Sequence, residues 1–293
     1  MPTLNPQRAL SLIRQALNED LGSGDITSRA VIPPQLRIRA RIVAKSRGVV
    51  SGVKMAALTF GVVDRAVRCR IHKHSGDPVE PGTTILTVEG KARSIFAAER
   101  VALNFLGHFS GISTLTSQFV RQVRGTRAKI LDTRKTIPGL RVLQKYAVKA
   151  GGGQNHRSNL SEAILIKTNH VLACSVQRIA DSEKVRQLIL KAKRKAKGKF
   201  IEVEVRNFSE FKAALEAKPH AILLDNWPIV SIRRAMRFLH AERSTLNARP
   251  FIEVSGGVTL ANVRRIAQTG IERISIGRLT HSAPSLDVSL QVR

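Results

Sequence analysis

The chain has 293 residues, of which 43% are apolar and 4% aromatic, and its formal net charge at pH 7 is +28. This length exceeds that of a usual single domain and suits an α/β barrel with a smaller module. No stretch approaches the roughly 18 consecutive apolar residues of a membrane span, and the N-terminal MPTLNPQRAL lacks the apolar segment of a secretory signal. We therefore expect a cytoplasmic protein without membrane contact.

Cysteine and lysine usage point to ordinary structural roles. Cys69 and Cys174 have no metal or redox spacing, and we expect each to be a buried small side chain. Positive charge is densest in the run KAKRKAKGK, residues 191–199. Nucleic acid would be a natural partner for such charge, but no aromatic residues are interleaved with this run to stack on bases. We expect a solvated helix end rather than a specific nucleic-acid site.

The first third of the chain predicts one helix followed by strands. Residues 6–20 have apolar side chains at helical spacing, and glycines at 22 and 24 end the pattern. Asp20 and Asp25, which flank that turn, are more typical of turn and cap residues than of catalytic acids. From Arg37 to Glu89 the apolar period changes to two, which predicts half-exposed strands joined by turns.

Residues 94–123 predict a long apolar helix. Ser94 would cap it, and Gly107 and Gly111 would bend or divide it. Glu99 and Arg100 form a charged pair inside this apolar segment. The pair is compatible with a surface stripe and equally with side chains directed into a site, and the residues alone do not choose between the two.

From residue 129 onward, short apolar runs alternate with helical patterns. Each run ends in charged, glycine or hydroxyl residues; the runs are KILDTRKT, AILIKTNH, KFIEVEVRN, HAILLDN, FIEVSGG and RISIGRLT. The helical patterns cover residues 139–150, 176–197, 209–217, 228–242 and 259–269. Such alternation predicts parallel strands with crossover helices. Functional-looking residues at the end of every strand favour an α/β barrel over an open doubly wound sheet.

Cations gather in the first part of this predicted barrel. Between Leu131 and His170 the only acids are Asp132 and Glu162, whereas the cationic residues include Arg134, Lys135, His156, Arg157, Lys167 and His170. Because these side chains occur at strand ends and in glycine-flanked turns, they predict a pocket for a small molecule with several negative charges. A solvated basic face is the alternative.

Carboxylates follow on the next two predicted strands. Glu202 and Glu204 alternate along one strand and therefore point to the same side, and Asp225 ends the next strand. Such a group suits Mg²⁺, which prefers oxygen ligands and takes the rest from substrate phosphates. Salt bridges to the many lysines and arginines explain the same residues equally well.

Glycines end the last two clear strands. Ser255, Gly256 and Gly257 lead into the predicted helix near Thr259, and Gly277 follows the final strand. Backbone N–H groups of such turns can close on a phosphate, and a following helix adds a favourable dipole. Together, the three groups predict transfer or rearrangement on a phosphorylated sugar with a second anionic substrate.

These stretches resemble the quinolinate phosphoribosyltransferases, also called carboxylating nicotinate-nucleotide pyrophosphorylases. The resemblance runs in order through nearly the whole chain: EDLGSGDIT, AERVALNFLGHFSGI, LDTRKTIPGLR, KYAVKAGGGQNHR, LIKTNH, IEVEV, LLDN, EVSGG and SIGRLTHSAPSLDVSL. It implies an N-terminal α/β sandwich domain, residues 1–112 joined by the tail 279–293, and an open seven-stranded α/β barrel, residues 113–278. It also implies a homodimer, or a higher homo-oligomer, with shared active sites.

The implied enzyme is a pentosyltransferase of NAD biosynthesis. It joins quinolinate to phosphoribosyl pyrophosphate with Mg²⁺, giving nicotinate mononucleotide, pyrophosphate and CO₂. The resemblance assigns the quinolinate carboxylates to a cationic set: Arg134, His156, Arg157, Lys167 and, from the partner subunit, Arg100. It assigns phosphate charge to Lys135, the Mg²⁺-pyrophosphate or ribose to Glu204 and Asp225, and the 5′-phosphate to Ser255, Gly256, Gly257 and Gly277. Lys135, Lys167, Glu204 and Asp225 form the implied catalytic group.

Three positions depart from the family pattern. Thr168 stands where an acid is usual, Asn159 where glycine is common, and Arg278 where a small residue follows SIG. The first two predict altered loop geometry beside Lys167 and Arg157, and Arg278 would crowd or reinforce the phosphate site.

The alternative function is that of a molybdenum-transport-associated relative with the same fold. The segment LSEAIL resembles that relative more than it resembles the quinolinate enzymes. A basic nucleic-acid-binding protein is a further alternative that rests on charge alone.

Overall fold

The computed structural model describes residues 6–174, 180–242 and 249–292. The chain forms two compact units: residues 1–117, 136–152 and 278–293 make the first, and residues 118–135 and 153–277 the second. The predicted domains place residues 136–152 with the barrel, whereas the compact units place them with the N-terminal part. Within the described residues, no helix combines the length and apolar character that crossing a membrane requires.

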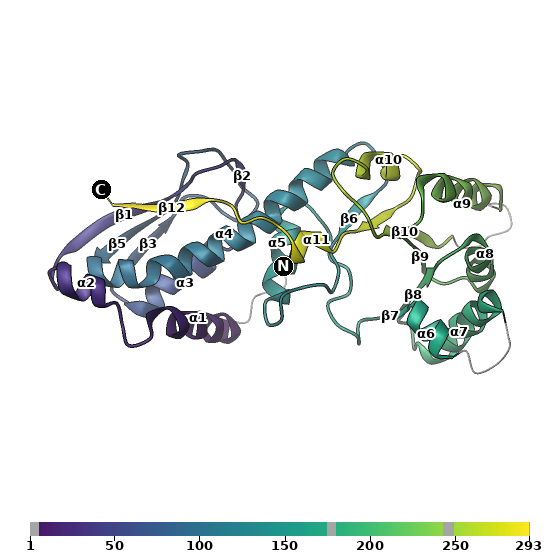
Figure 1. Ribbon diagram of the computed structural model, residues 1–293, viewed down its shortest axis with the longest axis horizontal. Helices are drawn as coiled ribbons and strands as arrows, with labels where there is room; N and C mark the ends of the chain where they lie inside the picture. Colours follow the sequence, from purple (N-terminus) through teal and green to yellow (C-terminus); the bar gives the residue numbers. More distant parts are fainter. Residues whose placement is uncertain (1–5, 175–179, 243–248, 293) are drawn as a thin grey trace. The chain divides into compact units, whose positions relative to one another are not determined.

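The first unit is built on a four-stranded antiparallel sheet with the order β12-β1-β5-β3. Its strands are β1 (Arg37–Ala44), β3 (Arg68–Ile71), β5 (Thr84–Lys91) and β12 (Val288–Val292), and a separate pair is formed by β2 (Gly48–Val49) and β4 (Pro78–Val79). As predicted, β1 alternates exposed cations with buried aliphatics. Figure 1 shows the last strand, β12 in yellow, beside the early strand β1. The chain's tail therefore completes the sheet of its first unit.

The helices described in the first unit are α1 (Pro6–Leu21), α2 (Ile26–Val31), α3 (Val53–Val63), α4 (Ala92–Gln122), α5 (Arg141–Ala150) and α11 (Arg278–His281). The core joins aliphatic side chains of β1 and β5 to those of α3 and α4, with Phe60 fully buried among them. Asp25 caps α2 by accepting the Ser28 N–H at 2.9 Å, so it is a capping residue as predicted.

The long helix α4 is continuous over 31 residues, so Gly107 and Gly111 do not divide it. They serve close packing instead, because a Cβ atom at Gly111 would overlap the carbonyl group of Pro284, and one at Gly107 would lie 3.0 Å from the Leu286 carbonyl oxygen. Ser94 is not the helix cap either. The helix already begins at Ala92, and the Ser94 hydroxyl donates to Asp64 at 2.8 Å.

The second unit contains a six-stranded parallel sheet with the order β6-β11-β10-β9-β8-β7. Its strands are β6 (Lys129–Leu131), β7 (Ala163–Ile166), β8 (Phe200–Val205), β9 (Ala221–Asp225), β10 (Phe251–Ser255) and β11 (Arg273–Ser275). All six match the predicted runs, and an additional parallel bridge joins Gln154 to Leu131 at the β6 edge. No ladder joins β6 to β7 within the described residues, so the barrel is open.

The helices of the second unit follow the strands in the predicted alternation (Figure 1). They are α6 (Thr168–Ala173), α7 (Asp181–Lys195), α8 (Phe208–Ala217), α9 (Ile229–Ala241) and α10 (Val263–Ala267). The prediction of a helix over 176–197 includes residues 176–179, which lie outside the described residues. The basic run forms the exposed last turn of α7, as expected of a solvated helix end.

The prediction that both cysteines are buried is wrong. Cys69 and Cys174 are solvent-exposed free thiols. Cys69 lies on β3, the edge strand of its sheet, where no further strand covers it. Cys174 follows the last turn of α6. Sequence spacing could exclude a metal or redox motif, but it could not tell that these elements lie at the surface.

We expect Gly111→Ala to lower the free energy of unfolding by about 1–3 kcal/mol, the usual cost of overpacking, because the new methyl group would overlap the Pro284 backbone. Urea denaturation followed by circular dichroism measures the change. Gly61→Ala, within α3 and with open space around its Cβ, is the matched control and should be neutral or stabilising by up to about 1 kcal/mol. Equal effects at the two positions would contradict this packing role.

Candidate active site

The register of the parallel strands places charged side chains on one face of the sheet. Glu204, Leu223, Glu253 and Arg273 are successive register partners across β8, β9, β10 and β11. Register partners in neighbouring strands point to the same side. Three charged residues therefore share a face that is apolar in most α/β barrels. This unusual inner face is where a site would be built.

One group of polar residues lies at the carboxyl ends of the strands, where α/β barrels bind their ligands. Glu204 is 10% exposed, and its Oε1 accepts two hydrogen bonds from Thr168, from the hydroxyl at 2.6 Å and the backbone N–H at 3.1 Å. The ammonium group of Lys167 lies 3.8 Å from Oε2 of the same carboxylate. Glu204 is thus held on one oxygen, and its second oxygen faces a half-exposed lysine.

Asp225 adds a second carboxylate to this group. Burial and the negative charge of Glu204 raise the pKa of Asp225, while a 3.0 Å hydrogen bond from the Asn226 amide and the charges of Lys167 and Lys135 oppose that rise. The raised pKa means that the two carboxylates repel each other, and a bound cation would relieve this repulsion. Because Mg²⁺ prefers oxygen ligands, Glu204 and Asp225 fit such an ion.

A second group of polar residues lies on the same face of the sheet and is more deeply buried. The imidazole ring of His156 is at its centre. His156 donates from Nε2 to Glu202 Oε2 at 2.9 Å, and Glu253 Oε1 lies 3.5 Å from the same nitrogen. Arg273 forms an ion pair with Glu253 at 2.9 Å. We call His156, Glu202, Glu253 and Arg273 the inner cluster. Its two glutamates are each 1% exposed, so their charges depend on these partners.

Arg157 lies beside the inner cluster and has a second arginine, Arg134, near it. Arg157 donates from Nη1 to the Ala163 carbonyl at 2.9 Å. Burial and the positive charge of Arg134 lower the pKa of Arg157, and the charge of Glu202 opposes this effect. The two guanidinium groups are therefore close enough to repel each other. An anion that binds between them would remove this repulsion.

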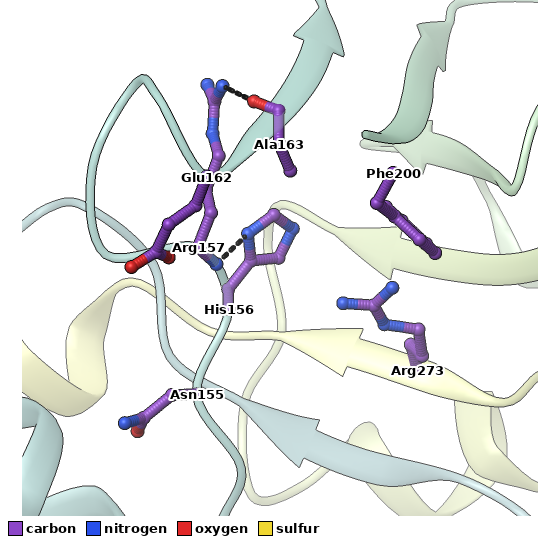
Figure 2. A pocket seen from close by; sticks show the side chains of 7 residues that line it. All are labelled: Asn155, His156, Arg157, Glu162, Ala163, Phe200 and Arg273. Carbon is purple, nitrogen blue, oxygen red and sulfur yellow. Dashed lines mark hydrogen bonds between the residues drawn. The ribbon is translucent and has the colours of Figure 1, made fainter. Parts of the chain in front are cut away.

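A pocket of about 260 Å³ opens beside this group. Its lining residues are Asn155, His156, Arg157, Glu162, Ala163, Phe200 and Arg273. Figure 2 shows the His156 imidazole and the Arg273 guanidinium extending into it, with Arg157 turned toward Ala163. Ala163, Phe200 and Arg273 are the first residues of their strands, whereas Lys167 follows β7 and Asp225 ends β9. The pocket therefore lies at the amino ends of these strands, and the pair of Glu204 and Asp225 lies at the carboxyl ends, on the same face of the sheet.

The predicted glycine turn after β10 is present, but the helix that follows it is shorter than expected. Gly256 adopts φ +84°, and a Cβ atom there would overlap the Asn226 side chain, whose own residue has φ +58°. The predicted helix over 259–269 begins only at Val263, because the Asn262 side chain accepts the Thr259 N–H at 2.8 Å and forms a turn instead. Backbone N–H groups of Ser255, Gly256 and Gly257, rather than a helix dipole, are what this turn offers a phosphate.

The structure brings most of the predicted site residues onto the second unit. Arg134, Lys135, His156, Arg157, Lys167, Glu204, Asp225, Ser255, Gly256, Gly257 and Gly277 all belong to it. Arg100 is exposed on α4 in the first unit, and Arg278 is exposed at the start of α11. Glu202 and Glu204, which we predicted to be carboxylates of one site, have different partners. Glu202 bonds His156, and Glu204 bonds Thr168.

Several contributing residues were not predicted as site residues. Glu253 and Arg273 join the inner cluster, and Thr168, considered only as a departure, holds Glu204. One sequence signal could have indicated Glu253 as a site residue. It is a charged residue inside an apolar strand run, two positions before Ser255. Asn159, another departure, builds an ordered turn by accepting the N–H groups of Ser161 and Glu162 at 2.9 and 3.2 Å.

Comparison with known proteins agrees with this architecture in both units. The sequence-family model of the quinolinate phosphoribosyl transferase N-terminal domain matches residues 25–110. The family model of the C-terminal domain matches residues 112–291. The nicotinate-nucleotide pyrophosphorylase [carboxylating] of Mycobacterium leprae is 41% identical over 97% of both chains. A quinolinate phosphoribosyltransferase [decarboxylating] of Nicotiana tabacum is 39% identical, covering 96% of this chain and 81% of its own.

Solved structures give the same result. The nicotinate-nucleotide pyrophosphorylase of Ehrlichia chaffeensis superposes with a TM-score of 0.88 at 35% identity and covers 100% of both chains. The enzyme of the same name from Francisella tularensis gives a TM-score of 0.88 at 32% identity, covering 99% of this chain and 98% of its own. This chain therefore belongs to the quinolinate phosphoribosyltransferase family.

Proposed function

We propose that this chain transfers the phosphoribosyl group of phosphoribosyl pyrophosphate to quinolinate and releases CO₂, giving nicotinate mononucleotide and pyrophosphate in NAD biosynthesis. The observation that carries the proposal is the match of both units to this family. Arg157, which lies beside the buried inner cluster with Arg134 near it, supports the proposal. Quinolinate has two adjacent carboxylates, and a site with neighbouring guanidinium groups matches such a dianion.

The first chemical step forms a bond from the pyridine nitrogen to C1 of the ribose while the bond from C1 to pyrophosphate breaks. The ribose carries positive charge as pyrophosphate leaves, so fixed carboxylates near it stabilise this state. Glu204 and Asp225 lie together at the strand ends and suit that role. Mg²⁺ held by the same two residues would neutralise charge on the leaving pyrophosphate. Lys135 and Lys167 supply further positive charge beside them.

In the second step the bond between C2 of the ring and its carboxylate breaks. The electron pair stays on C2, next to the positively charged ring nitrogen, and a proton then replaces the CO₂ that has left. The protein's part is to hold both carboxylates in place and to exclude water. Arg134 and Arg157 are the groups that we propose to do so, together with Arg100 of a second subunit. Both ring nitrogens of His156 already bond protein groups, Glu202 and the Arg157 backbone, so we assign this ring no direct contact with quinolinate. Exposure of Arg100 on α4 is compatible with such sharing in a homodimer.

We expect CO₂ release only when quinolinate, phosphoribosyl pyrophosphate and Mg²⁺ are all present, because each supplies a part of the first step. Quinolinate labelled in its 2-carboxylate should release the label, and quinolinate labelled in its 3-carboxylate should retain it in the product. Excess EDTA should stop release. Loss of label without phosphoribosyl pyrophosphate, or no release from folded protein, would contradict the proposed function.

We expect Arg134→Ala to lower kcat/KM for quinolinate by at least about 10–150-fold, the value of one charge-assisted hydrogen bond of about 1.5–3 kcal/mol. The variant should remain folded, because Arg134 follows the end of β6 and is only partly buried. Arg127→Ala, which removes an exposed cation from the same unit, is the control for general charge and should leave kcat/KM within about threefold.

Subunit complementation extends this test to Arg100. If sites are shared between two subunits, mixing inactive Arg100→Ala with inactive Arg134→Ala restores one intact site in each mixed dimer, or about a quarter of full activity. Absence of any recovery after verified subunit exchange would contradict shared sites.

We expect Thr168→Val to raise KM for phosphoribosyl pyrophosphate by about 10-fold, because it removes a hydrogen bond of about 1.5–3 kcal/mol from the Glu204 carboxylate. Initial rates at saturating quinolinate measure this. Thr168→Ser keeps the hydroxyl and should behave like the parent. An unchanged KM for phosphoribosyl pyrophosphate in the valine variant, with a changed KM in the serine variant, would show that the hydroxyl does not act through Glu204.

A further inference from the structure

The inner cluster is a buried set of charges to which no catalytic role has been assigned. Glu202 on β8 and Glu253 on β10 are separated by strand β9, yet both approach the same nitrogen of His156, at 2.9 and 3.5 Å. Two carboxylates with 1% exposure are costly to bury unless cations or hydrogen-bond donors compensate them. Their contacts indicate what they do.

His156 is fixed from its backbone as well as from its ring. The carboxylate of Asp132, which is fully buried, accepts the His156 backbone N–H at 2.9 Å. The backbone N–H of the next residue, Arg157, donates to Nδ1 of the imidazole at 2.8 Å. Figure 2 shows this last contact, in which the ring turns back onto the Arg157 backbone. The conformation of Arg157 is thereby coupled to the orientation of the His156 ring.

These hydrogen bonds select one form of the imidazole. Because Nδ1 accepts a hydrogen bond from Arg157, it carries no proton, so the proton must be on Nε2, which donates to Glu202. Burial disfavours the imidazolium, but the bond to Glu202 and the charges of Glu253 and Glu202 outweigh this and raise the pKa of His156. We assign the neutral Nε2–H form, because the 2.8 Å contact at Nδ1 is a direct geometric constraint.

A metal ion is a poorer explanation of the same residues. His156, Glu202 and Glu253 have possible ligand atoms that all lie within 4.8 Å of one another. However, the distance from His156 to Glu202 is that of a hydrogen bond, and Glu253 is paired with the Arg273 guanidinium. A cation at this place would have to displace Arg273 and the imidazole proton. The contacts describe a proton-mediated network instead.

We propose that Glu202 is a positioning residue for quinolinate: it holds His156 in the Nε2–H form, and the ring in turn fixes the backbone from which Arg157 reaches the substrate carboxylates. This inference rests on the proposed function. Arg273 supports the arrangement by pairing with Glu253, which keeps a second buried carboxylate from competing fully for His156. Glu202 itself does not touch the substrate.

The test compares Glu202→Leu with Glu202→Gln by steady-state kinetics. Leucine removes the nearer acceptor of the His156 Nε2–H and leaves beside it Glu253, which lies at 3.5 Å and is paired with Arg273, and we expect KM for quinolinate to rise by about 5- to 100-fold. KM for phosphoribosyl pyrophosphate should change by less than about threefold, since Glu204 is untouched. Glutamine keeps an acceptor oxygen and should restore most of the affinity for quinolinate. An unchanged quinolinate KM in a folded leucine variant would overturn the proposal.

A double-mutant cycle tests whether Glu202 acts through His156. In a His156→Ala background, the further change Glu202→Leu should have no additional effect on quinolinate KM. Full additivity of the two changes would overturn the proposal. Glu253→Gln, whose residue lies farther from His156, is the matched control for neutralising a buried carboxylate and should alter KM by less than Glu202→Leu.

A spectroscopic measurement keeps the inference testable if the leucine variant does not fold. Long-range ¹H–¹⁵N correlation spectra of the unmodified protein should show His156 with a proton on Nε2 and none on Nδ1 near neutral pH. A proton on Nδ1 would overturn the assignment. If the unmodified protein does not turn over quinolinate, the proposed function fails, whereas unchanged kinetics in the variants of an active protein reject only the role of Glu202.

Discussion

A carboxylate that loses its hydration inside a protein needs a cation or a hydrogen-bond donor in exchange, and this requirement organises the second unit. Its parallel register places three glutamates on one face of the sheet, where an ordinary barrel has aliphatic side chains. Each glutamate has its own partner: Glu202 with His156, Glu204 with Thr168, and Glu253 with Arg273. These partners come from the connection before β7, from the start of α6 and from strand β11. The site is therefore held together by the same pairs that make its burial tolerable.

Groups of like charge remain close together on either side of this network. Arg134 and Arg157 raise each other's electrostatic energy, as do Glu204 and Asp225. The fold keeps both pairs in place before any ligand arrives, so a dianionic substrate and a divalent cation would each find preformed complementary charge. Such preorganisation lowers the cost of binding and of charge development during reaction. The excess positive charge of the whole chain, +28, would also attract anionic substrates over longer distances at low ionic strength.

The first unit depends on close backbone contact rather than on charge. Gly107 and Gly111 let the C-terminal segment pass directly over α4, and that segment then continues as β12 at the edge of the sheet. Glycine spacing in an apolar helix usually suggests a bend, and here it marks the path of a distant part of the chain. The same pattern of residues thus has two physical explanations, and only the three-dimensional neighbour distinguishes them.

Much of this protein follows from the sequence by itself. Apolar runs with polar ends placed all six strands of the parallel sheet, and the period of two indicated the exposed and buried sides of β1, because these patterns reflect local backbone geometry. Family motifs supplied the candidate substrate and most of the candidate site residues. Pairing across strands was decided only by the tertiary structure: Glu202 belongs with His156 rather than with Glu204, Thr168 supports Glu204, and Arg273 reaches Glu253. A charged residue in a buried strand must have a partner, but that partner lies on another element of the chain, in a loop, at a helix start or on another strand, and only the tertiary structure brings the two together.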